Sequence, residues 1–318
     1  MQIVILDGYT TNPGDIDMSP LKKLGTLSVY DRTHPDMVAQ RLRGADAVFV
    51  NKVRLDRELI RSARSLKFIG VLATGYDVVD VHAAREQKIP VCNVPAYSTE
   101  AVAQHTIAML LAYASRIETH ANLVRQGHWS MNPDFSYWVI APMLLSGKTF
   151  GVFGTGKIGC KTAKIASALG MDVIGYSRTK NDSFCGRYVD KDTLFHSSDV
   201  LSLHCPATEE TIGLISEKTI PLMKDGAILL NTARGSLVEE KAIYEALRSG
   251  KLSFYGADVA TKEPIGKGNP LLSVPNCMIT GHYAWTPKPM RQTIIDVSAS
   301  NLEVFLSGKL QNCVNEKV

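Results

Sequence analysis

The sequence has few cysteines, no long hydrophobic run and no recognisable export signal. Six cysteines in 318 residues are too sparse for a disulfide scaffold, so we expect reduced thiols. No cysteine or histidine pair has zinc-ligand spacing, and we therefore expect no metal site. The most apolar stretch, residues 101–114, contains Gln104 and His105 and is too short to cross a bilayer. Because the N-terminus lacks a basic segment followed by an apolar one, we expect a cytoplasmic protein.

Charge of one sign is also scarce. There are 35 Lys and Arg against 31 Asp and Glu, a net charge of +4, and no run rich in Lys and Arg. This balance argues against a nucleic-acid partner. Hydrophobic residues make up 45% and charged residues 21%, which is ordinary for a globular protein and excludes disordered and fibrous classes. The length suggests two domains.

Short apolar runs alternate with longer helical patterns, which is typical of a parallel α/β architecture. Segments of helical character, such as 35–43 and 55–64, separate the first runs. Runs without alternating polarity fit strands buried on both faces of a sheet. We expect strands at 3–6, 47–50, 68–72 and 90–92, and a second series at 149–153, 172–176, 200–203, 227–230, 254–257 and 277–279.

The two series are joined by a segment of different texture. Ser98, Thr99 and Glu100 supply helix-capping types and an acid for the first turn of a helix. Residues 127–142 carry two tryptophans and two prolines without a clear period, and we interpret them as an ordered loop. A final helix is expected over 287–306, where apolar residues recur on one face.

A glycine-rich turn follows the strand at 149–153. Gly154, Gly156 and Gly159 form GxGxxG between an apolar strand and an amphipathic helix, which is the context that dinucleotide binding requires. The glycines allow a tight turn, approach of the backbone to a pyrophosphate, and close packing of helix on strand. The helix N-terminus offers N–H groups to phosphates, so Thr155, Lys157 and Ile158 join the candidate cofactor site. The alternative is a turn without a ligand.

The end of the next strand bears on the choice of cofactor. An acid there would hydrogen-bond the ribose of NAD, but the chain reads Ser177, Arg178, Thr179 and Lys180. Hydroxyl and cationic groups suit a 2′-phosphate, so we expect NADP(H) to be favoured or both cofactors to be used, with NAD(H) as the alternative. These residues could instead be solvated loop positions.

Three polar residues follow three later strands. Arg234, Glu263 and His282 lie after the strands at 227–230, 254–257 and 277–279. Because ligands bind beyond the carboxyl ends of parallel strands, these loops would deliver a guanidinium, a carboxylate and an imidazole to one cleft. A lone histidine is more often structural, but the joint placement predicts a catalytic site.

The sequence resembles the D-isomer-specific 2-hydroxyacid dehydrogenase family over nearly its whole length. The histidine loop is most similar to that of the glycerate dehydrogenase/hydroxypyruvate reductase and glyoxylate reductase branch. The sequence departs from the family at Gly281, where proline is usual, and at Ser177, where an acid is usual. The resemblance rests on the glycine turn and on five further motifs, at 73–77, at 204–206 with Thr208 and Thr211, at 231–235, at 263–264 and at 281–285.

The resemblance implies a division of roles. His282 would exchange a proton with the substrate oxygen, and Glu263 would hold the imidazole and favour its charged form. Arg234 would bind the substrate carboxylate through its planar fork. Thr74, Gly75 and Trp285 would complete the substrate site. Further cofactor contacts are implied for His204, Cys205, Pro206, Thr211, Thr232, Ala233, Asp258 and His282.

The family architecture implies two doubly wound parallel-sheet domains. A Rossmann coenzyme domain, residues 98–286, would be inserted in a flavodoxin-like substrate domain formed by residues 1–97 and 287–318. The cleft between them would close around the ligands. The resemblance also implies a homodimer built on the coenzyme domain, a small 2-oxoacid or 2-hydroxyacid substrate, and no membrane partner.

Two other functions stay open. A D-lactate dehydrogenase or another 2-oxoacid reductase of the same family would differ in the shape of its substrate pocket. A nucleotide-sensing binding protein, like the transcriptional corepressors of this fold, would need partner-binding extensions. Formate dehydrogenase fits less well because it lacks a carboxylate at the position of Glu263.

Overall fold

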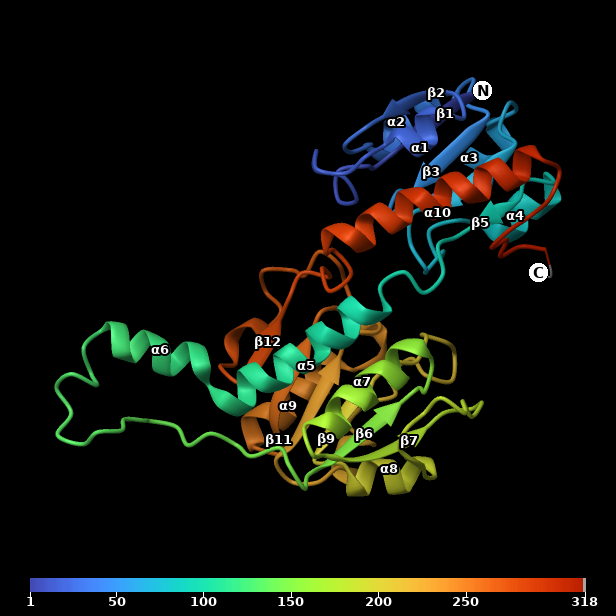
Figure 1. Cartoon of the computed structure of the whole chain (residues 1–318). Helices are drawn as coiled ribbons and strands as arrows, with labels where there is room; N and C mark the ends of the chain where they lie inside the picture. The colour runs from blue at the N-terminus through green and yellow to red at the C-terminus, as the bar shows by residue number, and fades with distance from the viewer. Residues whose placement is uncertain (317–318) are drawn as a thin grey trace. The chain divides into compact units, whose positions relative to one another are not determined.

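The computed structural model describes residues 1–316, and the chain divides into two compact units. Unit 1 comprises Met1–Ser98 with Trp285–Val318, and unit 2 comprises Thr99–Ala284. Each unit is built on one parallel sheet with helices on both faces (Figure 1). The predicted fold class, two doubly wound α/β domains with one inserted in the other, is confirmed.

Unit 1 contains a five-stranded parallel sheet in the order β2-β1-β3-β4-β5, which is the flavodoxin-like order. The strands are β1 (Gln2–Ile5), β2 (Thr26–Val29), β3 (Ala47–Val50), β4 (Phe68–Val71) and β5 (Val91–Cys92). All residues of β3 and β4 are buried, as unbroken apolar runs in a sheet covered on both faces require.

Helices bury both faces of this sheet. On one face α2 (Pro35–Leu42), α3 (Arg57–Ser62) and α4 (Val81–Glu86) contribute Val38, Ile60 and Ala83 to the core. On the other face α1 (Ser19–Lys22) and the long α10 (Lys288–Leu306) contribute Leu21 and Ile294. The C-terminal helix therefore completes the core of a sheet made from the first third of the chain (Figure 1).

Unit 2 contains a seven-stranded parallel sheet in the order β12-β11-β10-β9-β6-β7-β8. Strand order reverses between β6 and β9, which marks the point where doubly wound sheets bind ligands. The strands are β6 (Thr149–Phe153), β7 (Asp172–Tyr176), β8 (Arg187–Tyr188), β9 (Val200–Leu203), β10 (Ala227–Asn231), β11 (Leu252–Ala257) and β12 (Cys277–Ile279).

Two hydrophobic cores lie on opposite faces of this sheet. Helices α5 (Thr99–Ser115) and α7 (Lys157–Ala168) pack into one of them, and α8 (Lys191–Ser197) and α9 (Glu240–Ser249) pack into the other. Short 3-10 turns η1 (Ile220–Leu222), η2 (Gly235–Leu237) and η3 (Pro270–Ser273) connect the later strands. The arrangement leaves the carboxyl ends of the strands, with their loops, along one edge.

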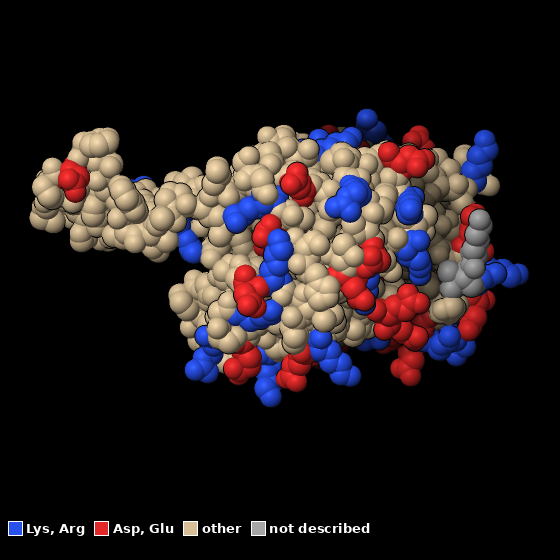
Figure 2. All heavy atoms as spheres, turned by 90° about the horizontal axis from the view of Figure 1, so that it is seen from below, with Lys and Arg blue, Asp and Glu red and all other residues tan. Residues whose placement is uncertain are grey.

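An arm projects from unit 2. The long helical pattern is interrupted at Arg116, which adopts a left-handed conformation with φ 51°, and a second helix, α6 (Ile117–Arg125), follows. The chain then returns through the loop predicted at 127–142, which carries no helix or strand (Figure 1). We refer to residues 117–142 as the arm. On the face shown in Figure 2, its outer part carries few charged side chains.

The predicted strands all form, and the last helix begins at Lys288, one residue later than predicted. The sequence did not reveal β2 or β8. Strand β2 is largely exposed at the sheet edge and β8 has two residues, so neither carries an apolar run. No helix among residues 1–316 combines the length and apolarity that a membrane span needs. No cluster of three potential metal ligands occurs in the same residues.

Candidate active site

Three candidate residues lie in loops at one edge of the unit 2 sheet. Arg234 follows β10, Glu263 follows β11 and His282 follows β12. These strands are parallel neighbours, because β11 pairs with both β10 and β12. Their carboxyl ends therefore meet at the same edge, where an open parallel sheet binds its ligands.

A buried asparagine shapes the turn that carries Arg234. Asn231, which is fully buried, donates from Nδ2 to the Arg234 carbonyl at 2.9 Å and accepts from the Ala233 N–H at 3.1 Å. Thr232 is held by a hydroxyl hydrogen bond of 2.9 Å to Thr106 of α5. The half-buried Arg234 thus emerges from a turn whose backbone is tied down at each end.

Gly235 allows two of the loops to approach each other. A Cβ atom at this position would lie 2.0 Å from the carbonyl carbon of Ala260, closer than any side chain permits. The Ala260 N–H donates to Oε1 of Glu263 at 3.2 Å. Glycine at 235 therefore brings the Arg234 turn against the loop that positions Glu263.

His282 and Glu263 form the central pair of the site. Nδ1 of His282 lies 2.7 Å from Oε2 of Glu263, with side chains 28% and 35% exposed. His282 adopts a left-handed backbone conformation, φ 55°, and its N–H donates to the Thr280 carbonyl at 3.1 Å. Such a conformation is uncommon for residues other than glycine, and departures of this kind concentrate at functional sites.

A buried carboxylate holds the loop that carries His282. Asp258, 2% exposed, accepts hydrogen bonds from the Thr280 hydroxyl and from the backbone N–H groups of Tyr283 and Ala284. Nε2 of His105, on α5, lies 3.0 Å from the same Thr280 hydroxyl. Sequence reasoning did not identify His105 as part of the site, because its partner is 175 residues away.

The glycine turn lies at the point where strand order reverses. Gly154 has φ +101°, and a Cβ atom on it would lie 2.7 Å from the His204 carbonyl carbon. A Cβ atom on Gly159 would lie 2.0 Å from the Gly154 oxygen, whereas Gly156, at the N-cap of α7, faces open space. The first and third glycines therefore serve packing, and the second leaves room for a pyrophosphate at the helix N-terminus.

The loop after β9 packs against this turn. The His204 N–H donates to the Phe153 carbonyl at 2.8 Å, and its Nε2 lies 2.8 Å from the Ser202 hydroxyl. Burial lowers the pKa of His204 to about 4, so the imidazole is neutral near pH 7. Burial likewise raises the pKa of the Cys205 thiol to about 11. The His204 and Cys205 side chains are therefore uncharged near pH 7.

The remaining residues of the predicted cofactor site are placed around the same edge. The Thr211 hydroxyl accepts a hydrogen bond of 2.8 Å from the Thr208 N–H. It also donates a hydrogen bond of 2.7 Å to the carbonyl of Pro206, an exposed residue. Thr155 is buried, while Lys157 is exposed and Ile158 half-buried at the start of α7. The Thr211 hydroxyl is thus engaged in folding its own loop.

The loop after β7 lines a pocket of about 560 Å³. Its lining includes Ser177, Thr179 and Lys180 but not the exposed Arg178. The Tyr188 hydroxyl accepts the Asn181 N–H at 2.7 Å and lies 2.7 Å from the Thr155 hydroxyl. Asn181 Nδ2 also donates to the Thr155 carbonyl at 3.0 Å. These bonds fasten the loop to the glycine turn.

Other residues lining this pocket are Thr155, Gly156, Asn181, Asp182 and Ser183.

Thr74, Gly75 and Trp285 belong to unit 1. The Thr74 hydroxyl donates to the Val94 carbonyl at 2.9 Å, and the Asn93 side chain donates to the Thr74 carbonyl at 2.7 Å. Trp285 packs edge-on against Tyr97 with ring centroids 6.3 Å apart. The turn after β4 is therefore anchored to the chain that follows β5.

Comparison with known proteins places these features in a family. Residues 107–284 match the sequence model of the NAD-binding domain of D-isomer-specific 2-hydroxyacid dehydrogenases. A hydroxypyruvate reductase from Blautia hydrogenotrophica is 46% identical over 99% of this chain and 100% of its own length. The similarity therefore extends through both units.

Solved structures share the complete architecture. D-lactate dehydrogenase from Aquifex aeolicus, complexed with NAD and lactic acid, superposes with a TM-score of 0.86 at 30% identity over the full length of each chain. An acyclic imino acid reductase (Bsp5), in complex with NADPH and D-Arg, gives a TM-score of 0.86 at 30% identity, covering 99% of this chain and 100% of its own.

Proposed function

Because the chain belongs to the D-isomer-specific 2-hydroxyacid dehydrogenase family of oxidoreductases, we propose that it interconverts hydroxypyruvate and D-glycerate, and also reduces glyoxylate. In this proposal unit 1 is the substrate domain and unit 2 is the coenzyme domain. The observation that carries the proposal is the His282–Glu263 pair at 2.7 Å, at the sheet edge that also carries Arg234. The 46% identity to a hydroxypyruvate reductase favours this substrate.

The cofactor is a nicotinamide dinucleotide. When bound, its reduced nicotinamide supplies the hydride that reduces the substrate carbonyl. The open space at Gly156 and the close packing at Gly154 and Gly159 suit a pyrophosphate at the N-terminus of α7. We assign the further contacts to the His204–Pro206 loop, Thr211, Thr232 and Ala233, with Asp258 near the nicotinamide carboxamide.

The side chains at the sheet edge would divide the chemistry of reduction. Arg234 would bind the substrate carboxylate with its planar fork, which lysine cannot copy. Since Nδ1 of His282 faces Glu263, Nε2 is the nitrogen that would give its proton to the carbonyl oxygen. Glu263 would orient the ring and stabilise its charged form. In the oxidation direction, neutral His282 would take the hydroxyl proton.

Residues of unit 1 would also bind the substrate. Thr74 and Gly75 follow a buried strand, and the Thr74 carbonyl and hydroxyl are both engaged by hydrogen bonds to Asn93 and Val94. A turn held in this way can present backbone N–H groups to a carboxylate at low entropic cost. We assign these N–H groups, together with Trp285, to substrate binding.

We infer that NADPH is used at least as well as NADH. The pocket after β7 offers the hydroxyls of Ser177 and Thr179 and the ammonium of Lys180 to a 2′-phosphate. The Asp182 carboxylate also lines this pocket and would oppose a phosphate, which favours dual use over exclusive use of NADPH. Arg178 is exposed outside the lining, so Lys180 is the stronger candidate cation.

We also propose a homodimer formed through the coenzyme domain. The arm exposes large apolar side chains, among them Met131 at 75%, Phe135 at 93% and Trp138 at 60%. Large apolar side chains exposed in one segment favour a protein interface. A second copy of the chain is the partner that the family architecture favours. Localisation in the cytoplasm stays a prediction.

One assay separates this function from the D-lactate dehydrogenase alternative. The rate of reduction would be measured with hydroxypyruvate, glyoxylate and pyruvate, using NADH and NADPH in turn. We expect the highest kcat/KM with hydroxypyruvate. A preference for pyruvate would assign the chain to the lactate dehydrogenase type, and no turnover with any 2-oxoacid would favour a nucleotide-sensing binding protein.

A further inference from the structure

Two cysteines far apart in the sequence lie directly opposite each other in unit 1. Cys92 ends β5, and Cys313 belongs to the segment that follows α10. The two residues form an antiparallel bridge at the edge of the five-stranded sheet. Neither cysteine takes part in the catalytic chemistry proposed above, so we considered what these two thiols could do together.

The hydrogen bonds around the bridge define its geometry. The Asn93 N–H donates to the Asn312 carbonyl at 3.1 Å, and the Val314 N–H donates to the Val91 carbonyl at 2.8 Å. These bonds flank the two cysteines, which therefore form a non-hydrogen-bonded pair. The Cα atoms of such pairs are about 4.5 Å apart and their side chains lie on the same face. This spacing is within the range of about 4.4–6.8 Å that disulfides require.

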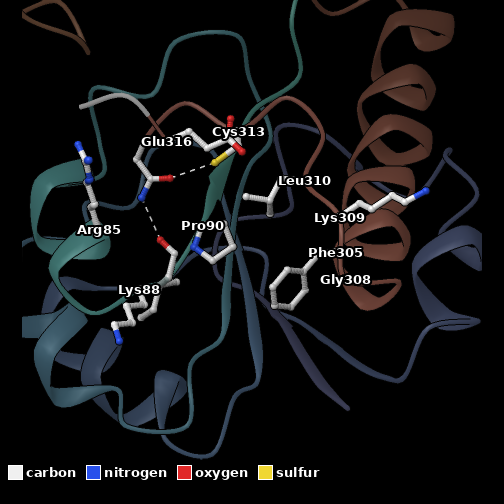
Figure 3. Close-up of a pocket in the computed structure, with 11 residues that line it drawn as sticks. Arg85, Lys88, Pro90, Phe305, Gly308, Lys309, Leu310, Cys313 and Glu316 are labelled. Atoms are coloured by element: carbon white, nitrogen blue, oxygen red, sulfur yellow. Dashed lines mark hydrogen bonds between the residues drawn. The ribbon is translucent and has the colours of Figure 1, made fainter.

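The two thiols interact with each other and differ in access to solvent. Cys92 is 1% exposed, and burial together with the Cys313 thiol raises its pKa to about 12. Cys313 is half-buried and lines a pocket of about 410 Å³. Its Sγ lies 3.2 Å from Oδ1 of Asn315, as the dashed line at Cys313 in Figure 3 shows.

The pocket beside Cys313 gives a small oxidant access to this thiol. Arg85, Lys88, Lys309 and Glu316 also line the pocket (Figure 3). Cys313 is half-buried, whereas Cys92 is buried in the core. A peroxide that enters the pocket therefore reaches Cys313 before Cys92.

We propose that Cys92 and Cys313 form a disulfide when the protein meets a peroxide. The Cys313 thiol gives up its proton as its sulfur attacks one oxygen of hydrogen peroxide, the O–O bond breaks, and the departing hydroxide takes that proton, so the products are a sulfenic acid and water. The Cys92 sulfur then attacks the Cys313 sulfur, the S–O bond breaks, and the hydroxide leaves as a second water with the Cys92 proton. Two thiols are oxidised and one peroxide is reduced.

The disulfide would tie the C-terminal segment to the sheet. In the reduced protein, this segment is held by packing of Val314 and Cys313 against the core and by hydrogen bonds, including those between the buried Asn315 and Val91 and Ile89 at 2.9 Å each. The bond would also restrain Asn93, which follows Cys92 and holds the Thr74 carbonyl. This proposal is independent of the substrate assigned above.

The test uses the full-length Cys185→Ser variant, which removes the one exposed cysteine among the described residues. The folded protein is treated with hydrogen peroxide, its remaining thiols are alkylated in denaturant, and tryptic peptides are analysed without reduction. We expect a linked pair formed by residues 89–116 and 310–317, loss of two titratable thiols, and recovery of both with dithiothreitol. The oxidised protein should also melt at a higher temperature than the reduced protein.

The matched control is Cys185→Ser with Cys313→Ser, which should lose no thiol pair and show no rise in melting temperature. Three results would overturn the proposal. They are oxidation of Cys313 to sulfinic acid without linkage, a link that appears only after unfolding, and unchanged thiols at peroxide levels that modify Cys185 in the parent. Because peptide analysis of the Cys185→Ser protein alone distinguishes these outcomes, the test stands even if the double variant folds poorly.

Discussion

Nδ1 of His282 faces Oε2 of Glu263 at 2.7 Å. With Nδ1 directed at this carboxylate, we assign proton exchange with the substrate oxygen to Nε2. The loop that carries His282 is held by the buried Asp258, whose carboxylate accepts hydrogen bonds from two backbone N–H groups of this loop. The imidazole is therefore oriented by one carboxylate while its loop is positioned by another.

Replacing Glu263 with Gln should slow reduction of a 2-oxoacid. Glutamine keeps a carbonyl oxygen that can face Nδ1 of His282 but lacks the negative charge of the carboxylate, and hydrogen bonds to charged groups contribute about 1.5–3 kcal/mol. We expect kcat/KM for the 2-oxoacid to fall by about tenfold or more, while nucleotide affinity stays at the parent value. Parent kinetics in this variant would exclude Glu263 from the site.

Arg234→Lys should not behave as a conservative change. Lysine keeps the charge but loses the two-pronged geometry that matches a carboxylate. We expect at least about a tenfold loss in kcat/KM for the 2-oxoacid, which is what one hydrogen bond to a charged group contributes. Cofactor affinity, measured by nucleotide fluorescence, should stay at the parent value. Parent kinetics in this variant would instead give Arg234 a purely structural role.

The cofactor loop gives a third prediction. Ser177→Asp should reduce kcat/KM with NADPH by about tenfold or more, because an acid repels a 2′-phosphate and replaces a hydrogen-bond donor. Lys180→Ala should also reduce kcat/KM with NADPH. Arg178→Ala should reduce it less, because Arg178 is exposed and does not line the pocket.

The double variant Ser177→Asp with Arg178→Ala provides the decisive control for this loop. It should convert the parent to a preference for NADH. If the parent already prefers NADH strongly and the double variant leaves that preference unchanged, the loop after β7 does not read the 2′ position.

Gly235→Ala should destabilise the protein and impair catalysis. The added methyl group would meet the Ala260 backbone at 2.0 Å, and overpacking typically costs about 1–3 kcal/mol. Gly268→Ala is a matched control, because a Cβ atom there has nothing within 4 Å. Thermal melting should fall by several degrees for the first variant and stay near the parent for the second. Equal melting temperatures would show that the Arg234 and Glu263 loops can move apart without lowering the stability of the protein.

The placement of Arg234, Glu263 and His282 could be predicted because each follows a strand without alternating polarity. Strands β10 and β11 are almost wholly buried and β12 is a half-buried edge strand, and the carboxyl ends of parallel strands share one edge. The glycine turn was predictable for a similar reason, since its spacing has meaning only between a strand and a helix.

Contacts that join distant parts of the chain could not be predicted in this way. Asp258 binds the 280–284 loop and Thr280 meets His105 of α5, but neither pairing follows from local pattern. The projection of the arm from unit 2 could not be predicted from the local sequence pattern either. The edge strands β2 and β8 could not be predicted because neither contains an apolar run. Cys92 and Cys313 were expected as separate reduced thiols, and only the fold brings them together.

The central claim is that His282 transfers the proton, and the most direct measurement is single-turnover reduction of hydroxypyruvate by His282→Ala. General acid–base catalysis contributes at least about a hundredfold. We therefore expect the rate of the chemical step to fall by that factor or more, while nucleotide binding keeps its parent affinity. A parent rate of turnover in His282→Ala would contradict the account.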